Sequence, residues 1–283
     1  MNYQSYEDMA DVIRRNLWKI PADVDLIVGV PRSGMIAALM IAELLNKPCG
    51  LILNTEQMLT MSGGVRESYN TMEIPVKILV IEDVVNTGYS INKIKAALAG
   101  HHKDWEFIYA AIYVEGKDAK SLVDIYLQDN YIPDDPDWFY EWNILHHSKS
   151  DRCMWDIDGL LCKNPPDDHD TADYEQYIRN PLPMVIPTYP VGGFVTYRLE
   201  KYRDLTEAWL QRNHIRYKQL IMFAAQDRET RNNYMPPAIY KARMYMNHPE
   251  YILFIESDAD QALEIWDCSH KPVYCYENGK LYK

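Results

Sequence analysis

Short apolar runs that alternate with segments of helical spacing constrain the fold of this 283-residue chain more than any other feature. In the first half they predict strands at residues 25–30, 50–54, 77–81 and 107–114 and helices at 6–18, 35–45 and 90–98. In the second half they predict strands at 152–157, 194–196, 217–222 and 251–256 and helices at 200–213, 238–247 and 260–266. Strands that alternate with helices pair in parallel, with helices on both faces of the sheet. We therefore predict an α/β protein with two doubly wound, mostly parallel sheets.

Two such patterns, with no repeat linking them, indicate two domains. Residues 133–137 are rich in Pro and Asp, and residues 146–150 read as a polar linker. We place the domain boundary within this linker, which gives domains at residues 1–148 and 149–283.

Composition excludes several classes of partner. Lys and Arg number 29 against 41 Asp and Glu, a net charge of −12 that disfavours nucleic-acid binding. The longest apolar stretch, residues 35–45, is broken by Glu43 and is too short to span a bilayer. The N-terminal residues are polar and acidic, unlike a secretory signal. Five scattered cysteines without a CxxC pair indicate reduced thiols. We expect a cytoplasmic protein that binds neither nucleic acid nor membrane.

The first motif with chemical content lies at residues 78–90. Four apolar residues lead into Glu82 and Asp83, and a turn containing Gly88 then opens a helix. Ligands of parallel α/β sheets lie outside the carboxyl ends of the strands. The N–H groups of such a turn form an anion cradle, to which Thr87 and Ser90 add hydroxyls. The motif predicts a phosphate in the turn and a polyol or Mg²⁺ at the acids. The alternative is an ordinary strand–turn–helix joint with solvated acids.

This motif resembles the phosphoribosyl-pyrophosphate signature of type I phosphoribosyltransferases: an apolar strand, two acids, two apolar residues and then x-Thr-Gly-x-Ser/Thr. The resemblance implies a phosphoribosyltransferase fold for the first domain. It implies that Glu82 and Asp83 engage the ribose hydroxyls, directly or around Mg²⁺. It also implies that the 5′-phosphate is bound by the turn residues Asn86, Thr87, Gly88, Tyr89 and Ser90.

Two more segments fit the same resemblance. Residues 28–34 follow the first strand, where such enzymes bind pyrophosphate, which implies roles for Arg32, Ser33 and Gly34 and a cis peptide between Pro31 and Arg32. Residues 63–69 resemble the mobile loop that closes over the reaction, with Ser68 and Tyr69 like the Ser-Tyr pair of hypoxanthine-type enzymes. A lid is needed because water would hydrolyse a donor whose transition state resembles an oxocarbenium ion.

One departure from the family pattern leaves the identity of the acceptor base undetermined. Hypoxanthine-type enzymes carry an Asp where this chain has Asn86, and an amide cannot act as a general base. Adenine- and orotate-type enzymes also lack an acid there. The aromatic residues 138–142 either stack on the acceptor base or pack in the core. The resemblance further implies a homodimer.

The second motif is Asp156-Ile-Asp158-Gly159 at the end of a predicted strand. Alternate strand residues share a face, so one acid can attack while the other handles a proton, with Mg²⁺ shielding the phosphate charge. Later predicted elements carry Thr196, Lys241 and the acids Glu256 and Asp258. Surface acids at strand ends are the alternative reading.

This ordered set resembles the haloacid-dehalogenase superfamily. The resemblance implies Asp156 as nucleophile, Asp158 as general acid and base, Thr196 and Lys241 as phosphate ligands, and a magnesium site made of Asp156, Asp158, Glu256 and Asp258. Glu-Ser-Asp stands where the superfamily usually has paired Asp or Gly-Asp. Asp258 and Asp260 are therefore alternatives for the acid that completes the metal site.

Together the two resemblances imply a bifunctional enzyme of nucleotide metabolism. Its partners would be phosphoribosyl pyrophosphate with a base-like small molecule, and a phosphorylated small molecule, both with Mg²⁺. The alternative is a non-catalytic sensor or regulator that binds phosphoribosyl pyrophosphate, with only the second half, or neither, active.

Overall fold

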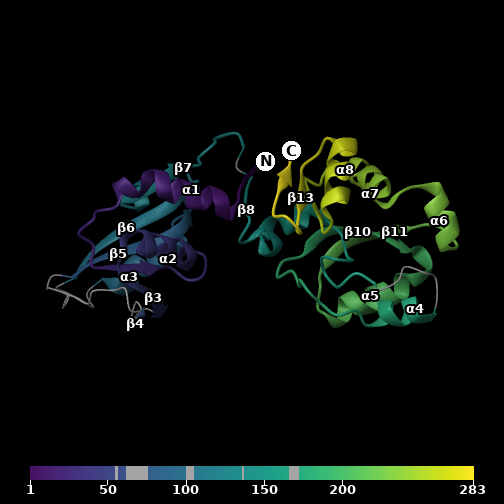
Figure 1. The fold of residues 1–283 in the computed structure, drawn as a ribbon, viewed down its shortest axis with the longest axis horizontal. Helices are drawn as coiled ribbons and strands as arrows, with labels where there is room; N and C mark the ends of the chain where they lie inside the picture. The colour runs from purple at the N-terminus through teal and green to yellow at the C-terminus, as the bar shows by residue number, and fades with distance from the viewer. Residues whose placement is uncertain (55–56, 62–75, 100–104, 136, 166–171) are drawn as a thin grey trace. The chain divides into compact units, whose positions relative to one another are not determined.

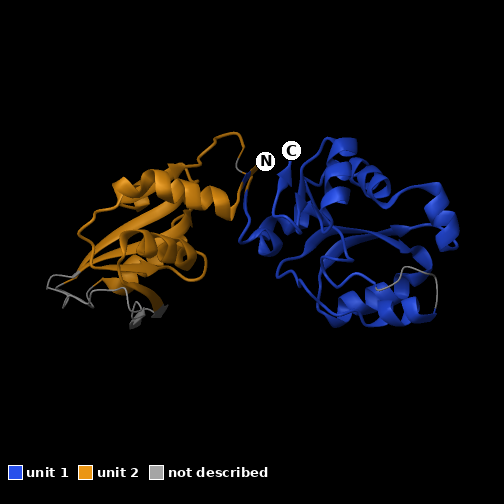
Figure 2. Ribbon diagram, viewed as in Figure 1, with its two compact units in different colours: residues 1, 3, 139–283 blue, residues 2, 4–138 orange. Residues whose placement is uncertain are grey.

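The structure is a computed structural model that describes residues 1–54, 57–61, 76–99, 105–135, 137–165 and 172–283. The chain forms two compact units (Figure 2). We call residues 2 and 4–138 the N-terminal unit, and residues 1, 3 and 139–283 the C-terminal unit. Each is built around its own six-stranded sheet. Among the described residues, no helix combines the length and apolar character needed to cross a lipid bilayer.

The N-terminal unit contains a sheet in the order β4-β3-β2-β5-β6-β7, in which only the β3–β4 pair is antiparallel (Figure 1). Its strands are β2 (Leu26–Gly29), β3 (Cys49–Asn54), β4 (Gln57–Met61), β5 (Val76–Val85), β6 (Trp105–Val114) and β7 (Ile125–Asp129). Its helices are α1 (Tyr6–Asn16), α2 (Gly34–Leu45) and α3 (Tyr89–Leu98). Two short strands, β1 (Asn2–Gln4) and β8 (Trp138–Tyr140), pair with each other.

Apolar alternation explains how this sheet is covered. One face of the central strands is lined by buried aliphatic side chains: Leu26, Val28, Ile78 and Val80. Ile94 and Leu98 of α3 pack against that face, four residues apart and hence on one side of the helix. Burying this surface orders β5 and α3, and with them the turn that joins the two elements.

The C-terminal unit contains a sheet in the order β11-β10-β9-β12-β13-β14, parallel except at β14 (Figure 1). Its strands are β9 (Cys153–Trp155), β10 (Val191–Leu199), β11 (Tyr217–Phe223), β12 (Leu253–Glu256), β13 (Val273–Cys275) and β14 (Leu281–Tyr282). Its helices are α4 (Ala172–Arg179), α5 (Arg203–Arg212), α6 (Arg228–Tyr234), α7 (Pro237–Met246) and α8 (Ala259–Ser269). Both units thus have the mostly parallel α/β architecture that the sequence predicts.

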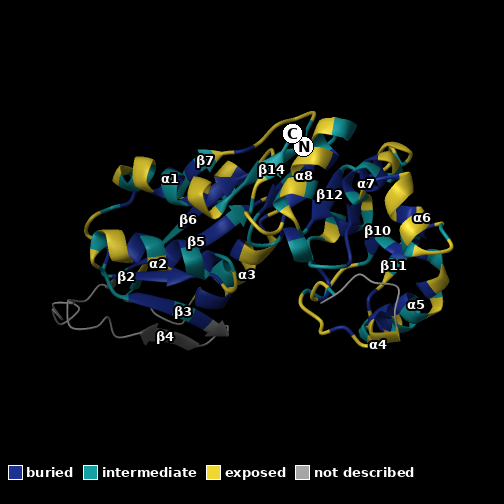
Figure 3. Cartoon of the chain, turned by 45° about the vertical axis from the view of Figure 1, so that its right-hand side comes forward, coloured by how far each residue is buried: buried dark blue, intermediate teal, exposed yellow. Residues whose placement is uncertain are grey.

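The compact units divide at residues 138/139, earlier than the boundary placed at 148/149. Phe139 and Ile144 are fully buried in the core of the C-terminal unit, together with Trp155 of β9. Residues 144–146 and 148–152 form short 3₁₀ helices, so the segment read as a linker belongs to the folded unit. The central strands β2, β5, β10 and β12 are largely buried, whereas the helices expose their outer faces (Figure 3).

Candidate active sites

The carboxyl ends of β2 and β5 lie side by side in the N-terminal unit. Gly29 pairs with Ile81, and the amide of Val30 donates a hydrogen bond of 2.9 Å to the Ile81 carbonyl. A Cβ added at Gly34 would lie 2.5 Å from that same carbonyl oxygen, so α2 can begin here only at a glycine. This close approach holds residues 30–34, the part of the predicted pyrophosphate segment 28–34 that follows β2, next to Glu82.

The predicted cis peptide is confirmed: the bond between Pro31 and Arg32 is cis. Arg32 is exposed and Ser33 is half-buried at the entrance of α2. The loop therefore offers a guanidinium and a hydroxyl on one side of β5, groups suited to an anion.

The acid pair is buried. Glu82 and Asp83 are each only 7% exposed. Burial raises the pKa of Glu82 to about 9, and the charge of Asp83 and a hydrogen bond with it add to the rise, while the Ser90 hydroxyl opposes it. The Glu82 Oε2 atom is buried and has no hydrogen-bond partner among the described residues. A buried carboxyl oxygen without a partner is costly, so this pair is arranged to receive a donor or a cation.

The turn between β5 and α3 is open to solvent and depends on one glycine. Gly88 has φ 75°, and a Cβ added there would lie 2.3 Å from Leu122 Cδ1. Asn86, Thr87 and Tyr89 are exposed, and no side chain caps α3. In this turn, which is predicted to bind the 5′-phosphate, the Tyr89 amide at the start of α3 donates a hydrogen bond of 3.4 Å to the Thr87 hydroxyl.

A residue that the sequence analysis did not identify lies beside this turn. The Asn86 Nδ2 atom donates a hydrogen bond of 3.1 Å to Oε2 of Glu115, the residue that follows β6. The Glu115 amide in turn donates to the Val85 carbonyl at 2.9 Å. Its position in the sequence was the one signal that could have identified Glu115, because this residue directly follows β6, the buried strand next to β5.

Two further predicted elements of this site are the Ser68–Tyr69 pair and the aromatic segment. Ser68 and Tyr69 lie outside the described residues. Of the aromatic segment at residues 138–142, Phe139 packs in the core of the C-terminal unit, which supports core packing for that side chain.

In the C-terminal unit, a cavity of about 330 Å³ lies at the carboxyl ends of β9, β10 and β12. These strands are neighbours in the order β10-β9-β12. Five of the predicted residues line the cavity: Asp156, Asp158, Thr196, Lys241 and Asp258. Residues from four segments far apart in the sequence therefore converge on one pocket.

Lys241 of α7 ties the buried acids together. Its ammonium donates to Asp156 Oδ2 at 2.9 Å and to Glu256 Oε2 at 2.7 Å, and also to Gln261 Oε1 at 3.0 Å. Burial alone would lower the pKa of Lys241, but the charges of Asp156 and Glu256 and the hydrogen bonds to them raise it above its ordinary value. Burial and the Glu256 charge raise the pKa of Asp156, and Lys241 opposes that rise.

Arg198, which the sequence analysis also did not identify, binds both carboxylate oxygens of Asp158. Its Nε atom donates to Asp158 Oδ2 at 2.9 Å and its Nη2 atom to Oδ1 at 2.6 Å. The guanidinium is 1% exposed and also contacts Thr206 Oγ1 at 3.3 Å. Arg198 stands two residues after Thr196 on β10, so strand alternation was the signal that both side chains share a face.

The four predicted metal ligands are already engaged by the chain. Glu256 is fully buried, does not line the cavity, and its Oε1 atom accepts from the amides of Ser257 and Asp258 at 2.9 and 3.3 Å. Asp258 Oδ1 caps α8 by accepting from Gln261 N at 2.8 Å. Over the described ranges, no three His, Cys, Asp or Glu side chains are grouped to hold a metal ion. This arrangement does not fit a divalent ion as it stands, and magnesium binding here stays a prediction.

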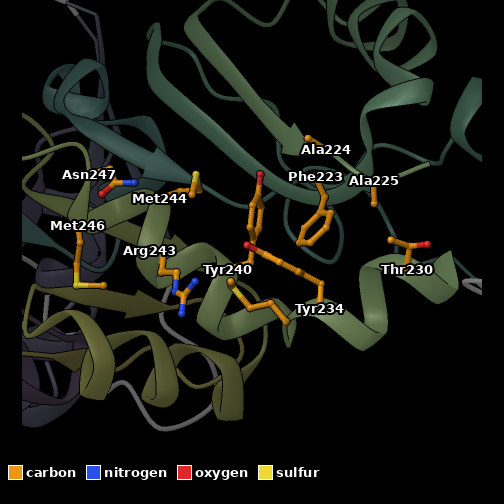
Figure 4. A pocket seen from close by; sticks show the side chains of 11 residues that line it. Phe223, Ala224, Ala225, Thr230, Tyr234, Tyr240, Arg243, Met244, Met246 and Asn247 are labelled. Carbon is orange, nitrogen blue, oxygen red and sulfur yellow. The ribbon is translucent and has the colours of Figure 1, made fainter. Parts of the chain in front are cut away.

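A second cavity of the C-terminal unit, of about 480 Å³, lies between α6, α7 and the end of β11 (Figure 4). Its walls include Phe223, Tyr234 and Tyr240, and no predicted site residue lines it. Tyr197 lines the acid-bearing cavity, and its ring lies 5.1 Å from the Phe223 ring and 6.1 Å from the Tyr240 ring. Tyr197 therefore stands between the two cavities.

No family model matches the chain, and no curated protein matches it. Among solved structures, a xanthine-guanine-hypoxanthine phosphoribosyltransferase of Helicobacter pylori is similar with a TM-score of 0.36 and 19% identity, over 50% of this chain and 93% of that one. A purine phosphoribosyltransferase of Pyrococcus horikoshii gives 0.33 and 18%, over 50% and 92%. An orotate phosphoribosyltransferase of Aeropyrum pernix gives 0.33 and 21%, over 44% and 70%. Similarity at this level carries no function to this chain, whose function is inferred from its site residues.

Proposed function

We propose that the N-terminal unit transfers a phosphoribosyl group between phosphoribosyl pyrophosphate and a base-like acceptor. The observation that carries the proposal is the buried pair Glu82 and Asp83, which lies between two segments whose groups suit anions, at the carboxyl ends of β2 and β5. The loop at residues 30–34 lies on one side of the pair and the turn at residues 86–90 follows it. A ligand with a diphosphate, two ribose hydroxyls and a 5′-phosphate matches these three features in order.

In this reaction the protein mainly positions the reactants and neutralises the charge of the leaving group. The bond between ribose C1′ and a pyrophosphate oxygen breaks, and its electron pair leaves with pyrophosphate. An acceptor nitrogen supplies the pair for the new C1′–N bond and releases its proton to water. Arg32 would neutralise the departing pyrophosphate, and the N–H groups at the start of α3 would hold the 5′-phosphate.

The acid pair also fits a magnesium ion. Glu82 has a buried oxygen without a partner and a carboxyl whose pKa burial and Asp83 raise to about 9. Glu82 and Asp83 would hold Mg²⁺ or the ribose hydroxyls, and a bound Mg²⁺ would neutralise charge on the diphosphate.

We propose, as a second function, that the C-terminal unit hydrolyses phosphomonoesters through an aspartyl phosphate. The supporting observation is that Asp156, Thr196 and Lys241 line one cavity. An Asp156 oxygen would attack phosphorus while the ester oxygen departs with its electron pair and takes a proton from water. A second water, giving its proton to Asp158, would then cleave the acyl phosphate to inorganic phosphate. Lys241 would offset the charge that gathers on the phosphoryl oxygens.

The two activities would be coupled in a useful direction. Phosphoribosyl transfer is reversible, whereas hydrolysis of a phosphate ester in water is effectively irreversible. Removing the 5′-phosphate of the product nucleotide would therefore draw the first reaction forward.

One set of assays tests both functions. The purified chain would be given Mg²⁺, phosphoribosyl pyrophosphate and a panel of bases, with pyrophosphate release measured, and separately a panel of nucleotides, with phosphate release measured. Asp83→Asn should abolish only the first activity and Asp156→Asn only the second. The exposed residues Asp134 and Asp267 provide matched Asp→Asn controls, which should leave both rates unchanged.

The same assays distinguish an enzyme from the alternative, a non-catalytic regulator. Donor binding without turnover on any acceptor would favour a phosphoribosyl-pyrophosphate-binding regulator, a reading that Asn86 in place of an acid keeps open. Loss of neither activity in the two variants would contradict both assignments.

A further inference from the structure

We infer that Glu115 selects the acceptor of the N-terminal site, so that this site takes a nitrogen heterocycle that presents an amino or N–H donor rather than a carbonyl. The inference rests on the proposed phosphoribosyl transfer and names the class of base that it uses.

Glu115 is held beside the phosphate turn by one backbone and one side-chain hydrogen bond. The Glu115 amide donates to the Val85 carbonyl at 2.9 Å, and its side chain accepts from Asn86 Nδ2 at 3.1 Å. A Cβ added at Gly116 would lie 2.3 Å from the Asn86 carbonyl oxygen, so the backbones on either side of this pair are in close contact. Glu115 is half-buried as a residue, and the hydrogen bond from Asn86 orients its carboxylate beside the turn.

Sheet order places this carboxylate on the acceptor side of the ribose. β5 lies between β2 and β6, and the loop proposed to hold pyrophosphate follows β2. A displacement in which the leaving group departs on one side of C1′ brings the incoming nitrogen from the opposite side. With the ribose at the end of β5 and pyrophosphate on the β2 side, the acceptor approaches from the β6 side. Glu115 is the first residue after β6.

The direction of the hydrogen bond from Asn86 to Glu115 determines which groups the acceptor base must present. An ionised carboxylate only accepts hydrogen bonds, so the Asn86 amide must turn its nitrogen toward Glu115 and its oxygen away. An acceptor base at this position meets the carboxylate oxygens of Glu115. A ring amino group or N–H would satisfy them, whereas a carbonyl oxygen in the same place would face like partial charge.

Binding of matched nucleotides tests the inference. The probes are the pairs adenosine and inosine 5′-monophosphate, and cytidine and uridine 5′-monophosphate, which differ in an amino group against a carbonyl. Titrations would use the full chain carrying Asp156→Asn, to suppress hydrolysis, and would count only binding that phosphoribosyl pyrophosphate displaces. Ribose 5-phosphate serves as the probe without a base. The variant is Glu115→Gln, and the control is Glu106→Gln, an exposed glutamate on β6 but not at its carboxyl end.

We expect at least one amino nucleotide to bind about tenfold or more tightly than its carbonyl partner. Glu115→Gln should bring that ratio close to one, and Glu106→Gln should leave it unchanged. Equal binding within both pairs, or a preference that survives Glu115→Gln, would overturn the inference while leaving the proposed transfer intact. If ribose 5-phosphate itself fails to bind in competition with phosphoribosyl pyrophosphate, the proposed transfer fails and the inference falls with it.

Discussion

Arg198 holds Asp158 through both carboxylate oxygens, at 2.9 and 2.6 Å, inside the acid-bearing cavity of the C-terminal unit. The guanidinium is almost fully buried, whereas one fifth of the Asp158 side chain is exposed. Fork-shaped pairs of this kind fix both distance and orientation. Asp158 is therefore positioned by β10, the strand that also carries Thr196.

The first prediction concerns this pair. Arg198→Met should lower the free energy of unfolding by about 3 kcal/mol, because it leaves Asp158 without its partner in a partly dry cavity. Denaturant unfolding monitored by circular dichroism measures the change. The control is Arg212→Met on the exposed side of α5, which should cost less than about 1 kcal/mol. Equal losses of unfolding free energy in the two variants would show that the Arg198–Asp158 pair stabilises the chain no more than an exposed arginine does.

The second prediction is a pH dependence set by Glu82. Its pKa of about 9 in the folded chain exceeds the ordinary 4.5, so between these values the folded state keeps a proton that the unfolded state has lost. Stability must therefore fall as pH rises through this window, by up to about 1.4 kcal/mol per pH unit from this group.

Glu82→Gln removes that proton linkage. Without ligand, the variant should become more stable than the natural chain as pH rises from 5 toward 9, and it should lose affinity for phosphoribosyl pyrophosphate. Thermal unfolding measured across this pH range tests the first part. Parallel curves for the two proteins would contradict the shifted pKa of Glu82.

The third prediction concerns the contact between α2 and β5. Gly34→Ala places a methyl group 2.5 Å from the Ile81 carbonyl oxygen, and a backbone atom cannot move aside cheaply. We expect a loss of about 1–3 kcal/mol of stability and weaker donor binding, because α2 is pushed away from the acid pair. Gly193→Ala is the comparison, since its nearest contacts are with the flexible Gln219 side chain at 3.2 Å. A smaller effect at Gly34 than at Gly193 would contradict the account.

The fourth prediction concerns Lys241. Lys241→Gln leaves Asp156 and Glu256 buried without their shared cation, so it should destabilise the chain by several kcal/mol and abolish phosphate release. Adding Glu256→Gln to that variant removes one of the two uncompensated acids. The double variant should regain stability but not activity, which unfolding curves and a phosphate assay would measure together. Additive losses of stability would argue against the shared ion pair.

Local sequence signals predicted the parts of the fold that depend on local structure. The apolar run before Glu82 predicted β5, and the turn at Gly88 predicted the start of α3 to within one residue. α6 was missed because Arg228–Tyr234 carries only one large apolar side chain, so no helical spacing marks it.

Side-chain partners distant in sequence could not be predicted in the same way. Asp158 meets Arg198 40 residues later, and Asn86 meets Glu115 29 residues later. Only the order of strands in each sheet brings these pairs together, and that order follows from packing of the whole unit. The acids and Lys241 were therefore predictable from the motifs, whereas Arg198 and Glu115 were not.

The central claim is that Glu82 and Asp83 form the ribose end of a phosphoribosyl-pyrophosphate site. The most direct measurement is calorimetric titration of phosphoribosyl pyrophosphate, with Mg²⁺, into the natural chain and into Asp83→Asn, with Asp134→Asn as control. We predict saturable binding to the natural chain and to the control, and a loss of about tenfold or more in affinity for Asp83→Asn. Absence of binding to the natural chain, or equal affinity in all three proteins, would contradict the claim.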